Sequence, residues 1–102
     1  MTHAAGGTFV VADGGARWRF DGTLTMDTAA AALASSRAIA LPASGIVDFA
    51  GLAQADSAAL AVMIALKRRA AGENRPIALA GVPASLASLA VVYGVDSLLQ
   101  DK

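Results

Sequence analysis

The feature that most constrains the fold is a strand pattern that leads through a short loop into a long helix pattern. IVDF at 46–49 is short, mostly apolar and contains β-branched residues, as in a strand covered on both faces. After the loop AGLAQA, residues 57–71 are strong helix formers. A second strand and helix follow at 75–81 and 83–94. Because a helix that joins two strands of one sheet makes a right-handed crossover, these strands are predicted to be parallel neighbours.

The N-terminal part of the chain predicts a β-hairpin followed by a helix. TFVVA (8–12) and ARWRF (16–20) are short β-type runs, and the DGG between them suits a tight turn. Asp21-Gly22 is expected to end the second strand. The alanine-rich stretch 25–40 then predicts a helix.

Together these elements predict a single α/β domain over residues 1–102, with a mixed sheet of about four to five strands and helices packed on it. Residues 1–7 are predicted to form a flexible tail. The C-terminal segment VDSLLQDK is expected to pack back on the domain through Val95, Leu98 and Leu99.

The charge balance argues against a partner that is recruited by a strong electric field. Lys+Arg and Asp+Glu both number 8, so nucleic acid is not an expected partner. No stretch approaches the roughly 20 apolar residues that span a bilayer, so direct membrane insertion is not expected either. The start of the chain lacks the pattern of a secretory signal, and the cytoplasm is therefore the expected location.

Groups that could carry out catalysis are scarce in the sequence. His3 is the only histidine and there is no cysteine, so a Ser57 nucleophile would have no base. Asp56 cannot replace that base, because adjacent residues at a helix start point in different directions. No phosphate-binding loop motif occurs. The sequence therefore predicts a protein that is not an enzyme and that uses no cofactor or metal.

The pair Asp56-Ser57 stands where the long helix is predicted to begin. Asp and Ser are preferred at helix starts because their oxygens accept otherwise unpaired N–H groups, which stabilises a helix by about 1 kcal/mol. Taken alone, the pair is best interpreted as a helix cap and not as an active site.

Around this predicted helix, aliphatic side chains reach nearly all the way round. At about 100° per residue, one apolar face consists of Ala59, Val62, Met63 and Leu66. The other side carries Ser57, Leu60, Ala61, Ile64, Lys67 and Arg68. This second side either docks a partner protein, or places Leu60 at the edge of the core and Ile64 against a neighbouring helix. A composition that is 56% hydrophobic and 16% charged favours a surface partly covered by another protein.

Several segments occur along the chain in an order known from one protein family. After the hairpin these are GTLTMDTA (22–29), IVDFAGLAQADSAAL (46–60), a basic helix end and VVYGVDSLL (91–99). In this order they resemble a STAS domain from end to end, and Asp-Ser-x-x-Leu is similar to the family's signature Asp-[Ser/Thr]-x-Gly-Leu. The family takes its name from sulfate transporters and anti-sigma factor antagonists. The resemblance implies a STAS-type α/β fold and a role in binding other proteins.

Two positions depart from the anti-sigma factor antagonists. In those proteins the phosphorylated serine is the second residue after the signature Asp, and that position here is Ala58. Alanine cannot accept the phosphate that switches docking in that group. The second departure is Ala59, where the family usually has Gly. Because of these two departures, an anti-sigma factor antagonist that binds a kinase-type anti-sigma factor is the second of two interpretations of the resemblance.

The sequence is more similar to the MlaB subfamily, the STAS subunits of Mla phospholipid transporters. The similarity rests on Asp-[Ser/Thr]-Ala at the helix start and on the Leu-x-x-x-Tyr pattern of Leu89 and Tyr93. It implies a subunit that binds the ATPase of an ABC transporter, with its membrane permease, on the inner face of the inner membrane. The implied contact includes Asp56 and Ser57, and we predict that the docking surface consists of Asp56, Ser57, Leu60, Ala61, Ile64, Lys67 and Arg68.

Overall fold

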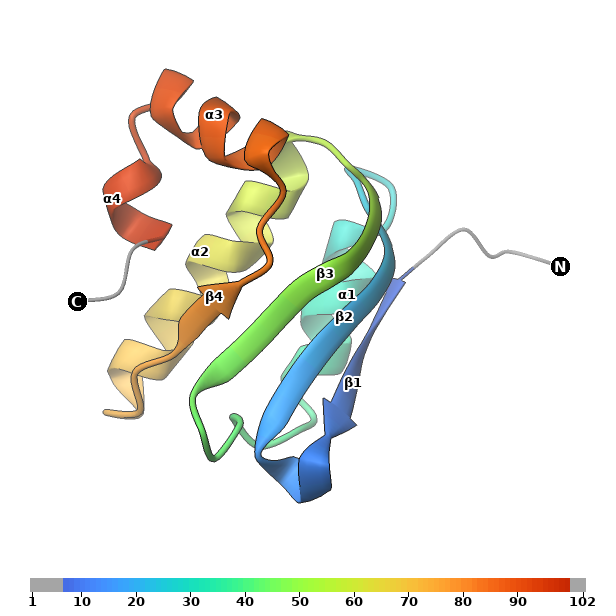
Figure 1. Cartoon of the computed structure of the whole chain (residues 1–102), viewed down its shortest axis with the longest axis vertical. Helices are drawn as coiled ribbons and strands as arrows, with labels where there is room; N and C mark the ends of the chain where they lie inside the picture. The colour runs from blue at the N-terminus through green and yellow to red at the C-terminus, as the bar shows by residue number, and fades with distance from the viewer. Residues whose placement is uncertain (1–6, 100–102) are drawn as a thin grey trace, which may run out of the picture.

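The computed structural model describes residues 7–99, which form a mixed sheet with helices on one side (Figure 1). Within this range the four strands lie in the order β1-β2-β3-β4. The first two pair antiparallel, while β3 pairs parallel with both β2 and β4. The elements are β1 (Gly7–Ala12), η1 (Asp13–Gly15), β2 (Arg17–Leu24), α1 (Ala29–Ser36), β3 (Ile46–Ala55), α2 (Ser57–Gly72), β4 (Ala78–Ala80), α3 (Ala84–Val92) and α4 (Asp96–Leu99). The predicted fold class, the hairpin and the parallel crossovers are confirmed.

Strands β2 and β3 are both longer than the sequence indicated. The expectation that Asp21-Gly22 ends the strand is wrong, as is the expectation that AGLAQA is a loop, because these segments pair with each other up to Leu24 and Ala55. The register shifts on both sides of Asp21-Gly22, which accommodates the irregular backbone. A Cβ atom on Gly51 would lie 2.7 Å from the carbonyl oxygen of Phe20, so only glycine permits this approach of the strands.

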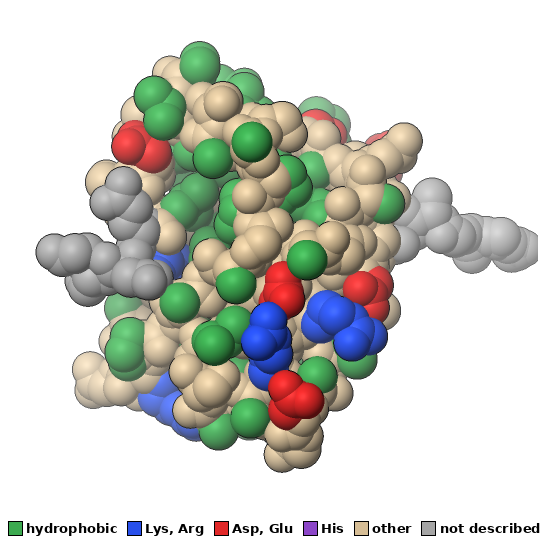
Figure 2. Space-filling model, in the orientation of Figure 1, with side chains coloured by type: hydrophobic (Ala, Val, Ile, Leu, Met, Phe, Trp, Pro, Cys, Tyr) green, Lys and Arg blue, Asp and Glu red, His purple; other side chains and the backbone are tan. Residues whose placement is uncertain are grey.

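The core lies on the helix side of the sheet. Trp18, Phe20, Val47 and Phe49 are all buried, and ring centroids of Phe9 and Phe20 are 5.0 Å apart. The prediction that residues 46–49 are covered on both faces is wrong, because Asp48 and Ile46 point to the other, open face and are only half-buried. Figure 2 shows acidic and basic side chains gathered on this open face.

Polar contacts fasten the connection between α1 and β3 to the core. Arg69 on α2 donates hydrogen bonds to the carbonyl oxygens of Ser36 at 2.9 Å and Ile39 at 2.8 Å. Its guanidinium carbon lies 5.9 Å from the centroid of the Trp18 ring. The Trp18 indole in turn donates to the carbonyl oxygen of Ala40 at 3.0 Å. The end of α1 and the chain after it are therefore held against α2.

Helix α1, strand β4 and helix α3 are shorter than predicted. Helix α1 covers only part of 25–40, because the Thr28 hydroxyl accepts a hydrogen bond from the Thr25 N–H and donates one to the Thr23 carbonyl, which fixes a turn before the helix. Strand β4 occupies three residues of the expected 75–81. In the C-terminal segment Val95 and Leu99 pack on the core, whereas Leu98 is 48% exposed.

Two further expectations concern the N-terminal tail and membrane insertion. Of the predicted tail, Gly7 is the first residue of β1, and residues 1–6 lie outside the described range, as does His3. None of the helices within residues 7–99 has the length and apolar character needed to cross a bilayer.

Candidate functional site

Asp56 is the cap of α2 and also a link to a distant loop. Its Oδ1 atom accepts a hydrogen bond from the Ala58 N–H at 2.8 Å, and its Oδ2 atom accepts one from the Met26 N–H at 3.0 Å. Its backbone carbonyl accepts a hydrogen bond from the Ala59 N–H at 2.9 Å. Both carboxylate oxygens are thus occupied, which confirms the capping interpretation for Asp56.

Ser57 differs from its neighbour because it is the exposed first residue of α2. Its hydroxyl makes no hydrogen bond to any other residue of the described range 7–99, so water or a partner satisfies it. Its removal should cost the fold little, and a change of its charge or size would alter the surface directly.

A stripe of accessible side chains runs along α2 from Ser57, on the face turned away from the sheet. Ser57, Ala61 and Arg68 are exposed and Ile64 is half-buried, at the spacing of one helix face. We call these four residues the α2 stripe. Leu60 does not belong to it, because this side chain is 3% exposed and lies in the core. Of the two predicted possibilities for Leu60, the core edge is the right one, and its predicted exposure on a docking surface is wrong.

Lys67 lies on the flank of the helix that faces β4. Its ammonium group donates a hydrogen bond to the Ile77 carbonyl at 2.8 Å, and the side chain is half-buried. It lines a cavity of about 580 Å³ between the second half of α2 and the segment before β4, which Leu98 also lines. Lys67 therefore borders the α2 stripe and anchors the helix to the segment just before β4.

A comparison with known protein families decides what kind of domain carries this helix. The family model described as "Mlab, STAS domain" matches residues 11–100, which is most of the chain. The chain belongs to this STAS domain family. No curated protein matches it significantly. STAS domains are generally non-catalytic and mediate protein–protein interactions, so an exposed helix surface is a candidate protein-binding site.

Two exposed apolar features of this STAS domain were missed by the sequence reasoning. Met26 is 80% exposed, and its backbone is bonded to Asp56, so it stands beside the start of α2. At the end of α3, Val92 is 76% and Tyr93 58% exposed, with Val91 also exposed. The available signal was that 84–92 contains no charged residue, which is unusual for a helix that shows one side to water.

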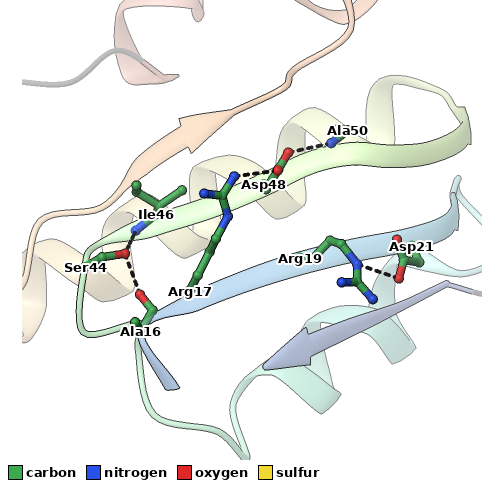
Figure 3. A network of polar contacts seen from close by, with 8 residues as sticks. All are labelled: Ala16, Arg17, Arg19, Asp21, Ser44, Ile46, Asp48 and Ala50. Atoms are coloured by element: carbon green, nitrogen blue, oxygen red, sulfur yellow. Dashed lines mark hydrogen bonds and ion pairs between the residues drawn. The ribbon is translucent and has the colours of Figure 1, made fainter. Parts of the chain in front are cut away.

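The STAS domain also carries a paired charge network on the open face of its sheet (Figure 3). Asp48 accepts a hydrogen bond from the Ala50 N–H at 2.8 Å and forms an ion pair with Arg17 at 2.7 Å. The Ala50 N–H and the Arg17 guanidinium hold the pKa of Asp48 below its ordinary value. A second pair joins Arg19 and Asp21 at 2.9 Å. The charges of each ion pair balance each other. The two pairs lie on the open face of the sheet, whereas the α2 stripe lies on the helix side.

The described residues were also compared with the requirements of a metal site and of a protein-binding surface. Across residues 7–99 no group of three or more His, Cys, Asp or Glu side chains is placed to hold a metal ion. What the domain presents at α2 is a capped helix start, one unpaired hydroxyl and a mostly small, apolar stripe that ends in Arg68. Such a surface is suited to contact with another protein.

Proposed function

We propose that this STAS domain is a non-catalytic subunit that binds the ATPase of an Mla-type ABC transporter, which moves phospholipid between the inner and outer membranes. The contact consists of Ser57 and the rest of the α2 stripe, with Asp56 holding the helix start in place. The proposal locates the protein in the cytoplasm, on the inner face of the inner membrane, through the ATPase and its permease. The observation that carries it is the exposed Ser57 hydroxyl at the head of this stripe.

Three features support a protein partner at this surface. The family assignment favours protein binding. The α2 stripe has small and aliphatic side chains at its centre, which allow close approach of a partner helix. Met26 adds a large exposed apolar side chain beside the helix start, which suits a buried anchor in an interface.

The mechanism requires no catalytic group on this chain. A domain that binds one arrangement of the ATPase more tightly than the others shifts the population toward that arrangement. It also stabilises the ATPase against dissociation or unfolding by mass action. Transport then rises because the active assembly is more abundant.

The alternative, an anti-sigma factor antagonist, requires a phosphate acceptor at the helix start. The position that matches the family's phosphorylated serine is Ala58, which is half-buried and donates its N–H to Asp56. Ser57 is exposed, so it is the hydroxyl that a kinase would reach in this version.

The test is co-purification of partners with the tagged protein, expressed at its natural level and solubilised in mild detergent. We compare the wild type with Ser57→Arg, and we use Ser35→Arg as the matched control, because Ser35 is an exposed serine near the end of α1. Circular dichroism first confirms that both variants are folded.

The proposal predicts that an ABC ATPase and its permease accompany the wild type and Ser35→Arg but not Ser57→Arg. Capture of a kinase-type anti-sigma factor in place of the ATPase would overturn the proposal in favour of the alternative. Equal ATPase capture by a folded Ser57→Arg variant would show that the contact lies elsewhere.

A further inference from the structure

The two edges of the sheet are protected to very different extents. Strand β4, at one edge, has only three residues and follows Pro76 closely. Strand β1, at the other edge, has six residues, GTFVVA, with no charge and no proline. Short strands, prolines and charged side chains are the usual means by which proteins prevent edge-to-edge pairing. The edge at β4 has such protection, and the edge at β1 lacks it.

The backbone of β1 has hydrogen-bonding capacity to spare. Within the part of the chain that the structure describes, β1 pairs with β2 alone, and its residues take part in no backbone hydrogen bond to a loop or a helix. In a strand, every second residue directs its N–H and C=O groups to the same side. Half of these groups on β1 therefore point away from β2.

We propose that the occupant of this edge is a second copy of the chain, whose β1 pairs antiparallel with the first across a twofold axis. The two four-stranded sheets then form one continuous eight-stranded sheet. A twofold interface brings the same patch together from both copies, so a strand that pairs with itself must be self-complementary. An uncharged strand meets that condition, because no like charges oppose each other across the axis.

The pairing of side chains fixes the register. With Val10 opposite Val10 at the axis, Phe9 lies opposite Val11 and Thr8 opposite Ala12, so each residue meets one from the same face of the sheet. Val11 is 47% exposed although it lies on the helix side, beside Trp18 in the register. In the dimer Val11 would lie beside the Phe9 of the second copy, whose ring is packed in its own core, so pairing would bury the exposed Val11 against a preformed apolar surface. This packing favours a second copy over an unrelated strand.

This inference does not depend on the proposed function. Pairing through β1 uses no residue of the α2 stripe, so a dimer would leave both stripes available. Its failure would leave the ATPase contact untouched, and the failure of that contact would leave the dimer untouched.

Disulfide trapping tests both the pairing and its register in the full-length protein. Since the chain has no cysteine, any disulfide must come from the introduced residue. We expect Val10→Cys to form a covalent dimer with itself under mild oxidation, because residues directly opposite in an antiparallel pair have Cα atoms about 4.5 to 5.5 Å apart. Thr8→Cys alone should not, because its two copies would be separated by four residues, or about 14 Å. A mixture of Thr8→Cys and Ala12→Cys proteins should again crosslink.

Sedimentation equilibrium over a dilution series gives the second readout. We expect the wild type to be dimeric at the higher concentrations, and Val10→Lys to weaken dimerisation at least fivefold by placing two lysines opposite each other. Ala53→Lys, an exposed position at the far end of β3, is the matched control and should dimerise as the wild type does.

Two outcomes would overturn the proposal. One is a monomeric wild type at every concentration together with no crosslink at Val10→Cys. The other is a dimer that Val10→Lys leaves unchanged while circular dichroism shows that the variant is folded, since the copies would then meet through another surface. In the first of these cases, a gain in mass on addition of a foreign peptide strand would assign the edge to a different partner.

Discussion

The carboxylate of Asp56 accepts a hydrogen bond from the backbone N–H of Met26, 30 residues earlier in the sequence, at 3.0 Å. The same carboxylate caps α2 through Ala58. One side chain thus joins the loop before α1 to the first turn of α2. The two segments that border the proposed docking surface are held in a fixed relation to each other.

Removal of the Asp56 carboxylate should destabilise the domain. We expect Asp56→Ala to lower the free energy of unfolding by about 1 to 2 kcal/mol, because the cap and the Met26 contact are both lost. Asp56→Asn should lower the free energy of unfolding by less than Asp56→Ala does, because its amide oxygen can still accept one of the two N–H groups. Urea denaturation measures the difference, and Ser57→Ala, which removes no hydrogen bond within the described residues, should stay within about 0.5 kcal/mol of the wild type. Equal stability of Asp56→Ala and Ser57→Ala would refute the linking role of Asp56.

Adjacent positions on α2 should respond in opposite ways. Leu60 is buried, so Leu60→Ala should cost about 2 to 4 kcal/mol of stability. Ala61 is exposed on the stripe, so Ala61→Glu should leave stability within about 0.5 kcal/mol and weaken capture of the partner. Chemical denaturation and quantitative co-purification separate the two effects. Unchanged capture by a folded Ala61→Glu variant would remove the middle of the stripe from the proposed interface.

Ile64 is intermediate in burial between Leu60 and Ala61, and it tests whether the docking surface extends past Ala61 along the α2 stripe. It is half-buried, and we expect Ile64→Asp to remain helical while it loses the partner. Circular dichroism and co-purification are measured on the same preparation. A fall in helix content would instead assign Ile64 to the packing of α2 against its neighbours.

The Arg17–Asp48 pair should make stability depend on pH at the acid end. The pKa of Asp48 is lowered in the folded protein, so its contribution is present above the ordinary carboxyl pKa and is lost as pH falls through the lowered value. Asp48→Asn can still accept the Ala50 N–H but lacks the charge, so we expect it to be less stable than the wild type by about 0.5 to 1 kcal/mol at pH 7. Urea denaturation at pH 7 and in strong acid should show this gap close on acidification. A gap that persists in acid would mean that the charge on Asp48 is not its source.

Gly81 should tolerate no side chain, for two separable reasons. Its φ is +67°, and an added Cβ would lie 2.6 Å from the Asp48 Oδ1 atom and 2.8 Å from the Ala50 nitrogen. Gly14 has a similar φ of +66° with no atom within 4 Å of such a Cβ, so Gly14→Ala reports the backbone strain alone. We expect about 1 kcal/mol for Gly14→Ala and at least about 2 kcal/mol for Gly81→Ala, measured by thermal and urea unfolding. Equal losses would show that β3 yields to the added methyl group at no cost.

The local features of the fold were predictable because their causes are local. The DGG turn, the alternation of Trp18 and Phe20 with the arginines, and Asp56 as a cap all depend on residues close in sequence. The full length of β3 was not predictable, because AGLAQA becomes a strand only through pairing with the irregular segment after Asp21. The open face of the sheet was not predicted for a similar reason, because only the placement of the helices decides that the face carrying Asp48 is exposed to water.

The candidate site was predictable in part. The spacing of Ser57, Ala61, Ile64 and Arg68 placed them on one helix face, as the structure has them. The same spacing could not assign Leu60, which lies at the border of that face and is buried by neighbouring elements. Met26 had no signal in the sequence, because its position beside the helix start follows from its long-range bond to Asp56.

The bond between Asp56 and Met26 has a thermodynamic consequence for recognition. Because it orders the loop and the helix start in the unbound domain, a partner would find the surface already assembled and would spend little of its binding free energy on immobilising backbone. Association through such a surface is expected to proceed at rates set by diffusion and orientation, without a slow folding step. Its heat-capacity change should then reflect the apolar area covered, with no added contribution from coupled folding.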